Sequence, residues 1–289
     1  MITEQFILDS KVALEIQKTR VAVATRLYSS KVEAVVRSHS NYSELLALRK
    51  NKSADRKETA QLTKKLLREQ LKAMGIDEEL FKNGLTSAKK EYAPYKMMIK
   101  AEESAFKLLE PQLSDIPVYG WLNEVRGLGL RYSVKLISKI RDMQRFENPS
   151  KLRTYCGCAP GCVNVRGVES NFNPELKGVL LGQVAENFIK NKSQYKRIYD
   201  EKKAYYLKLH PEALAEKVKG KKVTKDDWTK MKIHNFAKKT MINRFLVDFW
   251  MAWYLCEGKT PPKNPWIADQ PHHSLDPMIV PCALAKNVT

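Results

Sequence analysis

The chain has 289 residues, of which 51 are Lys or Arg and 32 are Asp or Glu, so its formal net charge is +19. A surplus of this size favours a polyanionic partner. No apolar run approaches the roughly 20 residues of a membrane span, and five cysteines in a lysine-rich chain argue against a disulfide framework. We therefore expect a cytoplasmic protein without a membrane segment.

The N-terminal third has the pattern of long helices. Apolar residues recur at helical spacing over residues 5–37, and residues 40–73 are polar and helix-forming with one leucine stripe. A third helix is expected over about 86–110, ending at Pro111. Residues 1–110 are thus predicted to form a helical hairpin or a coiled-coil arm.

The remainder also lacks convincing strands. Short helices joined by Gly and Pro turns are expected over 117–190, and longer helices over 175–209 and 227–257. Residues 111–257 would form a helical domain, followed by a proline-rich tail at 258–289. The fold class is accordingly predicted to be mainly α, with a helix-hairpin-helix in the second domain.

The predicted helix-hairpin-helix lies in the stretch VRGLGLRYSVKLISKI, residues 125–140. An apolar residue precedes a Gly-Leu-Gly turn at Gly127, Leu128 and Gly129. Glycines there would permit positive φ and let backbone amides approach a phosphate. Lys135 and Lys139, on one face of the following helix, could reach the same backbone. The alternative is an ordinary tight turn between two helices.

Several motifs follow this turn in a fixed order. They are Ser133–Val134, Asp142, Phe146 with Leu152, the turn from Gly157 to Pro160, and the helical segments at 171–189, 193–206 and 232–254. In this order they resemble the C-terminal domain of the DEDD insertion-sequence transposases, of the IS one-ten and IS eleven-eleven type. The resemblance covers about residues 120–257. It implies a domain that binds DNA, and RNA as a second ligand, because those transposases use a structured guide RNA.

Two departures from the family bear on catalysis. The family begins with a RuvC-like domain whose four carboxylates hold metal ions, whereas residues 1–110 here lack an alternating strand pattern. The family also has a nucleophilic serine soon after the glycine-proline turn, but residues 161–167 contain none, which leaves Ser170 as a weak catalytic candidate. The resemblance then implies a domain that holds nucleic acid without cutting it. The N-terminal arm would match the family's coiled coil.

Cys156, Cys158 and Cys162 form a C-x-C-x3-C cluster. Three thiols so close together are weak candidates for a metal site, with Cys256, His234 or His210 as a fourth ligand. The usual C-x2-C spacing is absent, and the alternative is a tight turn of small buried residues. No cofactor is predicted.

Further cations are candidates for phosphate contact: Arg131, Arg166, Lys177, Lys196, Arg197, Lys221, Lys222, Lys238 and Lys239. Tyr195 and Tyr199 alternate with some of them, which suits either base stacking or a half-buried helix face. The aromatic residues of the last helix, Phe236 among them, are expected in the core.

Three hypotheses remain open from the sequence. The first is a non-enzymatic nucleic-acid-binding protein, with DNA the expected ligand and RNA the second, dimeric or larger through its N-terminal arm. The second is an active recombinase that uses Ser170 or carboxylates of a partner. The third is a helical scaffold whose charge serves solubility and assembly.

Overall fold

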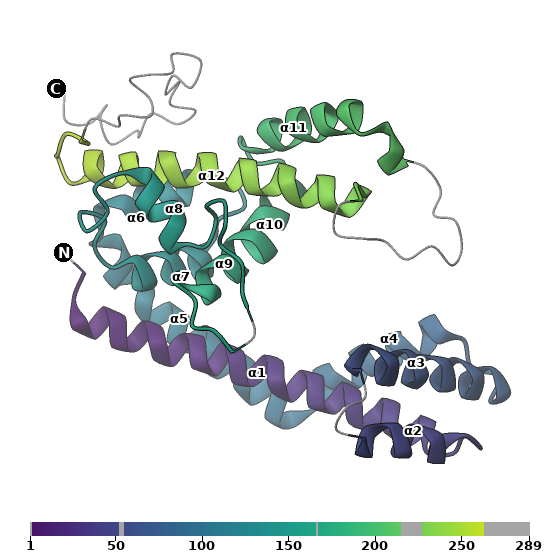
Figure 1. The fold of residues 1–289 in the computed structure, drawn as a ribbon. Coiled ribbons are helices and arrows are strands. Elements are labelled where there is room, and N and C mark those ends of the chain that lie inside the picture. The colour runs from purple at the N-terminus through teal and green to yellow at the C-terminus, as the bar shows by residue number, and fades with distance from the viewer. Residues whose placement is uncertain (1, 52–54, 166, 215–226, 263–289) are drawn as a thin grey trace. The chain divides into compact units, whose positions relative to one another are not determined.

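Helices dominate the computed structural model, which describes residues 2–51, 55–165, 167–214 and 227–262 (Figure 1). These residues contain no β-strand, so the prediction of a mainly α fold is confirmed. None of the helices in the described part of the chain is long and apolar enough to cross a membrane. The chain divides into two units: residues 11–107, and residues 1–10 together with residues from 108 onward.

The unit of residues 11–107 is built from long helices. Its elements are α1 (Glu4–Val36, from residue 11), α2 (Tyr42–Lys50), α3 (Arg56–Ala73), α4 (Glu78–Glu91) and α5 (Ala93–Ser114, as far as residue 107). Asp55 and Asp77 cap α3 and α4, because their carboxylates accept backbone N–H groups that have no partner within the helix.

Two sets of contacts hold this unit together. Side chains from α1, α2 and α3 form an apolar cluster of Val32, Val36, Leu45, Leu66, Leu67 and Leu71. Nearer the N-terminus of α1, Glu102 of α5 forms an ion pair with Arg20 and accepts a hydrogen bond from Gln17. Since Glu102 is 1 % exposed, α1 and α5 pack closely at this point.

The sequence expectation of one helix over 86–110 is wrong at both ends. Helix α4 ends at Glu91 and α5 begins at Ala93, immediately before Pro94. Proline lacks an N–H and clashes with the preceding turn, so it fits the first turn of a new helix. Pro111 does not end α5, which continues to Ser114 because the side chains of Leu109 and Leu113 are fully buried on either side.

The other unit consists of shorter helices around one long one. Its elements are α6 (Pro117–Glu124), α7 (Leu130–Ile140), α8 (Pro149–Tyr155), α9 (Pro174–Gly178), a π-helical segment (Val179–Val184), α10 (Ala185–Lys190), α11 (Lys196–Leu209), a 3₁₀ turn (Pro211–Leu214) and α12 (Lys230–Cys256). Helix α12 packs against α6, α8, α10 and α11 (Figure 1).

Aromatic side chains form the core beside α12. The ring of Trp121 stacks on Phe245 and Phe249, with centroids 6.1 and 5.9 Å apart. Phe188 and Tyr195 each meet Phe245 edge-on. The expected burial of most aromatic residues of the last helix is therefore confirmed.

The expected single helix over 175–209 is interrupted at residues 191–195. Lys192 adopts a left-handed φ of 51°, and the Ser193 amide donates to the Phe188 carbonyl at 2.9 Å. This six-to-one bond is a Schellman ending, which satisfies the last carbonyls of a helix and turns the chain away. Most of the predicted tail, residues 263–289, lies outside the described residues.

Candidate nucleic-acid surface

Helices α6 and α7 flank the Gly-Leu-Gly turn as the sequence predicted. Val125 and Leu128 are 1 % and 3 % exposed, so they anchor the turn to the core. Helix α7 begins after Gly129, and no side chain caps its N-terminus. Its first backbone N–H groups have no acceptor within the helix, which is the usual state of a helix start. The assignment of this pair as a helix-hairpin-helix stays a prediction.

The two glycines of the turn have different surroundings. Gly127 has φ of 92°, and a Cβ there would lie 3.0 Å from the carbonyl oxygen of Asn187 in α10. Gly127 is therefore needed for close packing of the turn on α10. Gly129 has an ordinary φ of −86°, is exposed, and a Cβ there would meet no atom within 4 Å. The open side of the turn is thus at Gly129.

The two lysines of α7 contact neighbouring segments of the same unit. Lys135 Nζ donates to Gln183 Oε1 at 3.4 Å, and Lys139 Nζ lies 2.7 Å from Glu175 Oε2. Arg131, in the first turn of α7, is exposed. The lysines that the sequence assigned to phosphate contact therefore have protein partners as well.

Other predicted cations also make internal contacts. Lys177 Nζ donates to the Cys162 carbonyl at 2.6 Å, and Lys239 Nζ donates to the Ala159 carbonyl at 3.0 Å, so both hold the cysteine turn. Lys196 and Arg197 each pair with a carboxylate one turn along α11. Arg166, Lys221 and Lys222 lie outside the described residues.

Lys238 belongs to a polar network in which the lysine is buried and the carboxylate of Glu186 is half exposed. Lys238 is 9 % exposed, and its Nζ lies 2.7 Å from Glu186 Oε1. His234 contacts the same carboxylate at 3.2 Å and the Tyr199 hydroxyl at 2.7 Å. The hydrogen bond from Lys238, followed by that from His234, lowers the pKa of Glu186 although partial burial opposes the change. This network joins α10, α11 and α12.

Tyr195 and Tyr199 are 0 % and 4 % exposed, so neither ring is open to a base. Both belong to the packing of α11 on its neighbours rather than to the stacking surface that the sequence left open. Phe236, in contrast, is 41 % exposed, and its expected place in the core is wrong. It lies beside a second group of rings, which includes Tyr206 and Trp228.

That second group was missed by sequence reasoning. Trp228 stacks on His210 with 3.7 Å between ring centroids, and Tyr206 and Phe236 lie 5.7 and 5.4 Å from Trp228. We call these four residues the aromatic cluster. The signal in the sequence is the spacing of Trp228, Lys232 and Phe236 at intervals of four, which is typical of one helical face, although α12 begins only at Lys230.

The three clustered cysteines lie in a tight turn after α8. Cys156 and Cys158 are fully buried, and burial raises the pKa of the Cys158 thiol to about 12 and that of Cys156 well above its ordinary value. Gly157, at φ of 68°, lies so close to Phe172 that a Cβ would meet its ring at 2.6 Å. In the described part of the chain, no group of three or more His, Cys, Asp or Glu side chains is arranged to hold a metal ion.

Ser170 lies in the loop that follows the cysteine turn. Its hydroxyl donates to the amide oxygen of Asn164 at 3.0 Å. An amide oxygen does not take up a proton as a general base, so this contact does not activate the hydroxyl for attack. Val163, Val165 and Val168 of the same loop are all more than half exposed.

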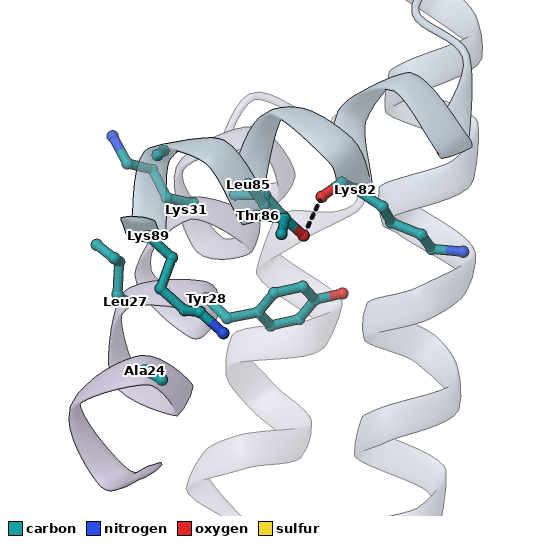
Figure 2. A pocket seen from close by; sticks show the side chains of 9 residues that line it. Ala24, Leu27, Tyr28, Lys31, Lys82, Leu85, Thr86 and Lys89 are labelled. Atoms are coloured by element: carbon teal, nitrogen blue, oxygen red, sulfur yellow. Dashed lines mark hydrogen bonds between the residues drawn. The ribbon is translucent and has the colours of Figure 1, made fainter. Parts of the chain in front are cut away.

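A cleft of about 240 Å³ lies between α1 and α4 in the unit of residues 11–107 (Figure 2). The ring of Tyr28 crosses it, and lysines stand at its rim. Figure 2 shows the amines of Lys31 and Lys82 pointing away from that ring, and Lys82 pairs with Glu78 at 2.8 Å. The cations therefore do not converge on a common point inside the cleft.

Comparison with known families identifies one segment. Residues 120–163 match the model described as the Transposase IS116/IS110/IS902 family. The match runs from α6 through the Gly-Leu-Gly turn, α7 and α8 to the cysteine turn. Residues 120–163 are therefore similar to this transposase family, which is consistent with a C-terminal transposase domain of the IS110 type, as the sequence motifs indicated. No curated protein and no solved structure matches the chain.

Proposed function

We propose that this chain is a transposase-derived protein that binds the backbone of DNA, with structured RNA as a second ligand, and does not cleave it. The observation that carries the proposal is the position of the family match, which covers the turn whose open side lies at Gly129. The net charge of +19 supports a polyanionic ligand.

The proposed contact is the start of α7. A helix N-terminus offers backbone N–H donors and a positive dipole end, and both favour a phosphate. Gly129 has no Cβ to hold the phosphate away, and a ligand atom could occupy the space beside it. Arg126 and Arg131 are exposed on either side of the turn. Such contacts would not depend on base sequence.

Lys139 would join the contact by exchanging partners. Its ion pair with Glu175 is partly exposed, with 31 % and 57 % of the two side chains accessible. Exposed pairs contribute only about 0–1 kcal/mol, so a phosphate can compete for the lysine. Lys238, buried against Glu186, is proposed instead to act in holding α10 to α12.

The test is binding of one labelled DNA duplex and one RNA stem of equal length over a salt series, measured by fluorescence anisotropy. Contact with several phosphates gives a linear fall of log Kobs with log salt. Gly129→Ala should weaken binding about tenfold if the backbone approaches a phosphate closely. Gly120→Ala is the matched control, since Gly120 is exposed in α6 and a Cβ there meets no atom within 4 Å.

Three results would contradict the proposal. They are a flat salt dependence, no binding at low salt, and equal affinity of Gly129→Ala and the parent. The absence of cleavage is tested separately with supercoiled DNA and divalent metal ions. Nicking that disappears in Ser170→Ala would favour the recombinase over the binding protein.

We further propose that the unit of residues 11–107 mediates self-association. It presents large apolar side chains to solvent, with Leu80 67 % and Met97 70 % exposed. Sedimentation equilibrium should give a dimer or larger species, and Leu80→Lys with Met97→Lys should shift it toward the monomer. A monomer at all concentrations would contradict this.

A further inference from the structure

The aromatic cluster occurs where the end of α11 meets the start of α12. Helices α11 and α12 lie side by side over this region (Figure 1). Tyr206 belongs to α11, His210 directly follows it, Trp228 precedes α12, and Phe236 lies in the second turn of α12. The His210 and Trp228 rings are nearly parallel, at 11°, and Tyr206 is inclined to Trp228 by 21°.

Tyr206, His210 and Trp228 are partly buried, whereas Phe236 and the neighbouring Tyr205 are exposed, unlike the core rings beside them. Phe236 is 41 % exposed, and Tyr205, which meets Tyr206 edge-on, is 55 % exposed. Trp121 and Phe249 of the core are no more than 3 % exposed. Two exposed rings that adjoin a group of stacked, partly buried rings offer aromatic faces to a ligand.

Lysines accompany the exposed rings. Lys232 Nζ lies 4.8 Å from the centre of the Trp228 ring, and Lys202 Nζ lies 5.4 Å from that of Tyr205. Lys208 and Lys230 are exposed nearby in sequence. His210 contacts Glu212 at 3.0 Å. Aromatic rings interleaved with cations are typical of surfaces that bind single strands.

We propose that the aromatic cluster, together with Tyr205, is a stacking platform for unpaired nucleotides. Bases would stack on the exposed faces of Phe236 and Tyr205, and Lys202 and Lys232 would contact the phosphates between them. The inference rests on the proposed function in that the ligand is nucleic acid, but it adds a second surface with a different preference. The turn at Gly129 contacts a backbone, whereas this platform requires bases that are free to unstack.

Binding should therefore depend on aromatic faces and not on apolar volume. Phe236→Leu and Tyr205→Leu keep an apolar side chain at each position but remove the π surface. If the cluster only closes the junction of α11 and α12, these variants should bind as the parent does. Tyr92→Leu is the control, because Tyr92 is 42 % exposed at the C-terminal end of α4, in the other unit.

The experiment measures the affinity of the full chain for a 15-nucleotide oligo(dT), an oligo(rU) of the same length, and a 15-base-pair duplex, at one salt concentration. The Phe236→Leu/Tyr205→Leu double variant should lose about tenfold or more of its affinity for the single strands. Its duplex affinity and melting temperature should equal those of the parent and of Tyr92→Leu. The two oligonucleotides distinguish DNA from RNA as the source of unpaired bases.

Each other outcome overturns a defined claim. Unchanged single-strand affinity in the double variant, with duplex binding intact, overturns the stacking platform and leaves the proposed function standing. An equal loss for single strands and duplex also overturns it, because the rings would then not distinguish unpaired bases. If single-strand binding depends on the rings and the duplex does not bind at all, only the backbone contact at Gly129 is contradicted. The stacking platform then stands. A parent chain that binds none of the three ligands overturns both.

Discussion

Lys139 of α7 and Glu175 of α9 form an ion pair with 2.7 Å between Nζ and Oε2. Lys139 lies on the helix that follows the Gly-Leu-Gly turn, and the sequence suggested that this lysine contacts a phosphate. A carboxylate therefore competes with the proposed ligand for this lysine. The proposed binding surface can therefore be tested by removing the competing carboxylate of Glu175, without adding a cation.

Glu175→Gln should tighten duplex binding about two- to fivefold at low salt, because it removes one negative charge and releases Lys139. Lys139→Gln should weaken it by a similar factor and make the salt slope shallower. Anisotropy titrations at three salt concentrations measure both effects. If Glu175→Gln leaves the affinity unchanged, Lys139 takes no part in binding.

Gly127→Ala should destabilise the fold by about 1–3 kcal/mol, since alanine is strained at a positive φ and its Cβ would press on the Asn187 carbonyl. Urea unfolding measures this loss of free energy of unfolding. Gly129→Ala serves as the comparison at the other glycine of the turn. It should change stability by less than about 1 kcal/mol, because its φ is ordinary and the space beside it is open. Equal stability losses would refute the different roles of the two glycines.

Glu186→Gln should cost about 1 kcal/mol of stability, because the Lys238 side chain is 11 % exposed and loses its counter-charge, while solvent at the half-exposed Glu186 screens the pair. Adding Lys238→Met to the same chain should recover part of the loss, since the buried charge is then gone. Urea unfolding of the two single variants and the double variant measures the coupling. Additive losses would show that the pair contributes no interaction energy.

Titration of Asp248 should lower the free energy of unfolding as the pH rises. Asp248 is 6 % exposed, and burial raises its pKa from 3.8 to about 6, although Arg244 lies 3.0 Å away and opposes the change. The folded state therefore holds this proton more tightly than the unfolded state. Its contribution to stability is full below about pH 4 and is lost by about pH 6, which amounts to about 3 kcal/mol.

The measurement is the free energy of unfolding of the parent minus that of Asp248→Asn, between pH 4 and pH 7. The subtraction removes the titration of other groups that both chains share. The difference should decline with increasing pH and level off above pH 6. A difference that rises with pH would mean that the ion pair with Arg244 outweighs burial.

The sequence by itself determined the local features of this protein. Helical periodicity identified residues 5–37 as a helix, and α1 spans Glu4–Val36. The helix expected after the Gly-Leu-Gly turn is α7, Leu130–Ile140. The transposase motifs were recognised from their order, and residues 120–163 match that family. These features depend on neighbours a few residues apart, which is the range over which periodicity and motif spacing carry information.

The tertiary structure decided which of these residues remain available to a ligand. Lys238 and Lys239 are adjacent in sequence, yet one is buried against Glu186 and the other holds the Ala159 carbonyl. Gly127 and Gly129 look equivalent until α10 packs on the first and leaves the second open. The aromatic cluster forms only because Trp228, just before α12, meets His210, just after α11. Such contacts join segments far apart in the chain, and their geometry depends on packing that no local pattern encodes.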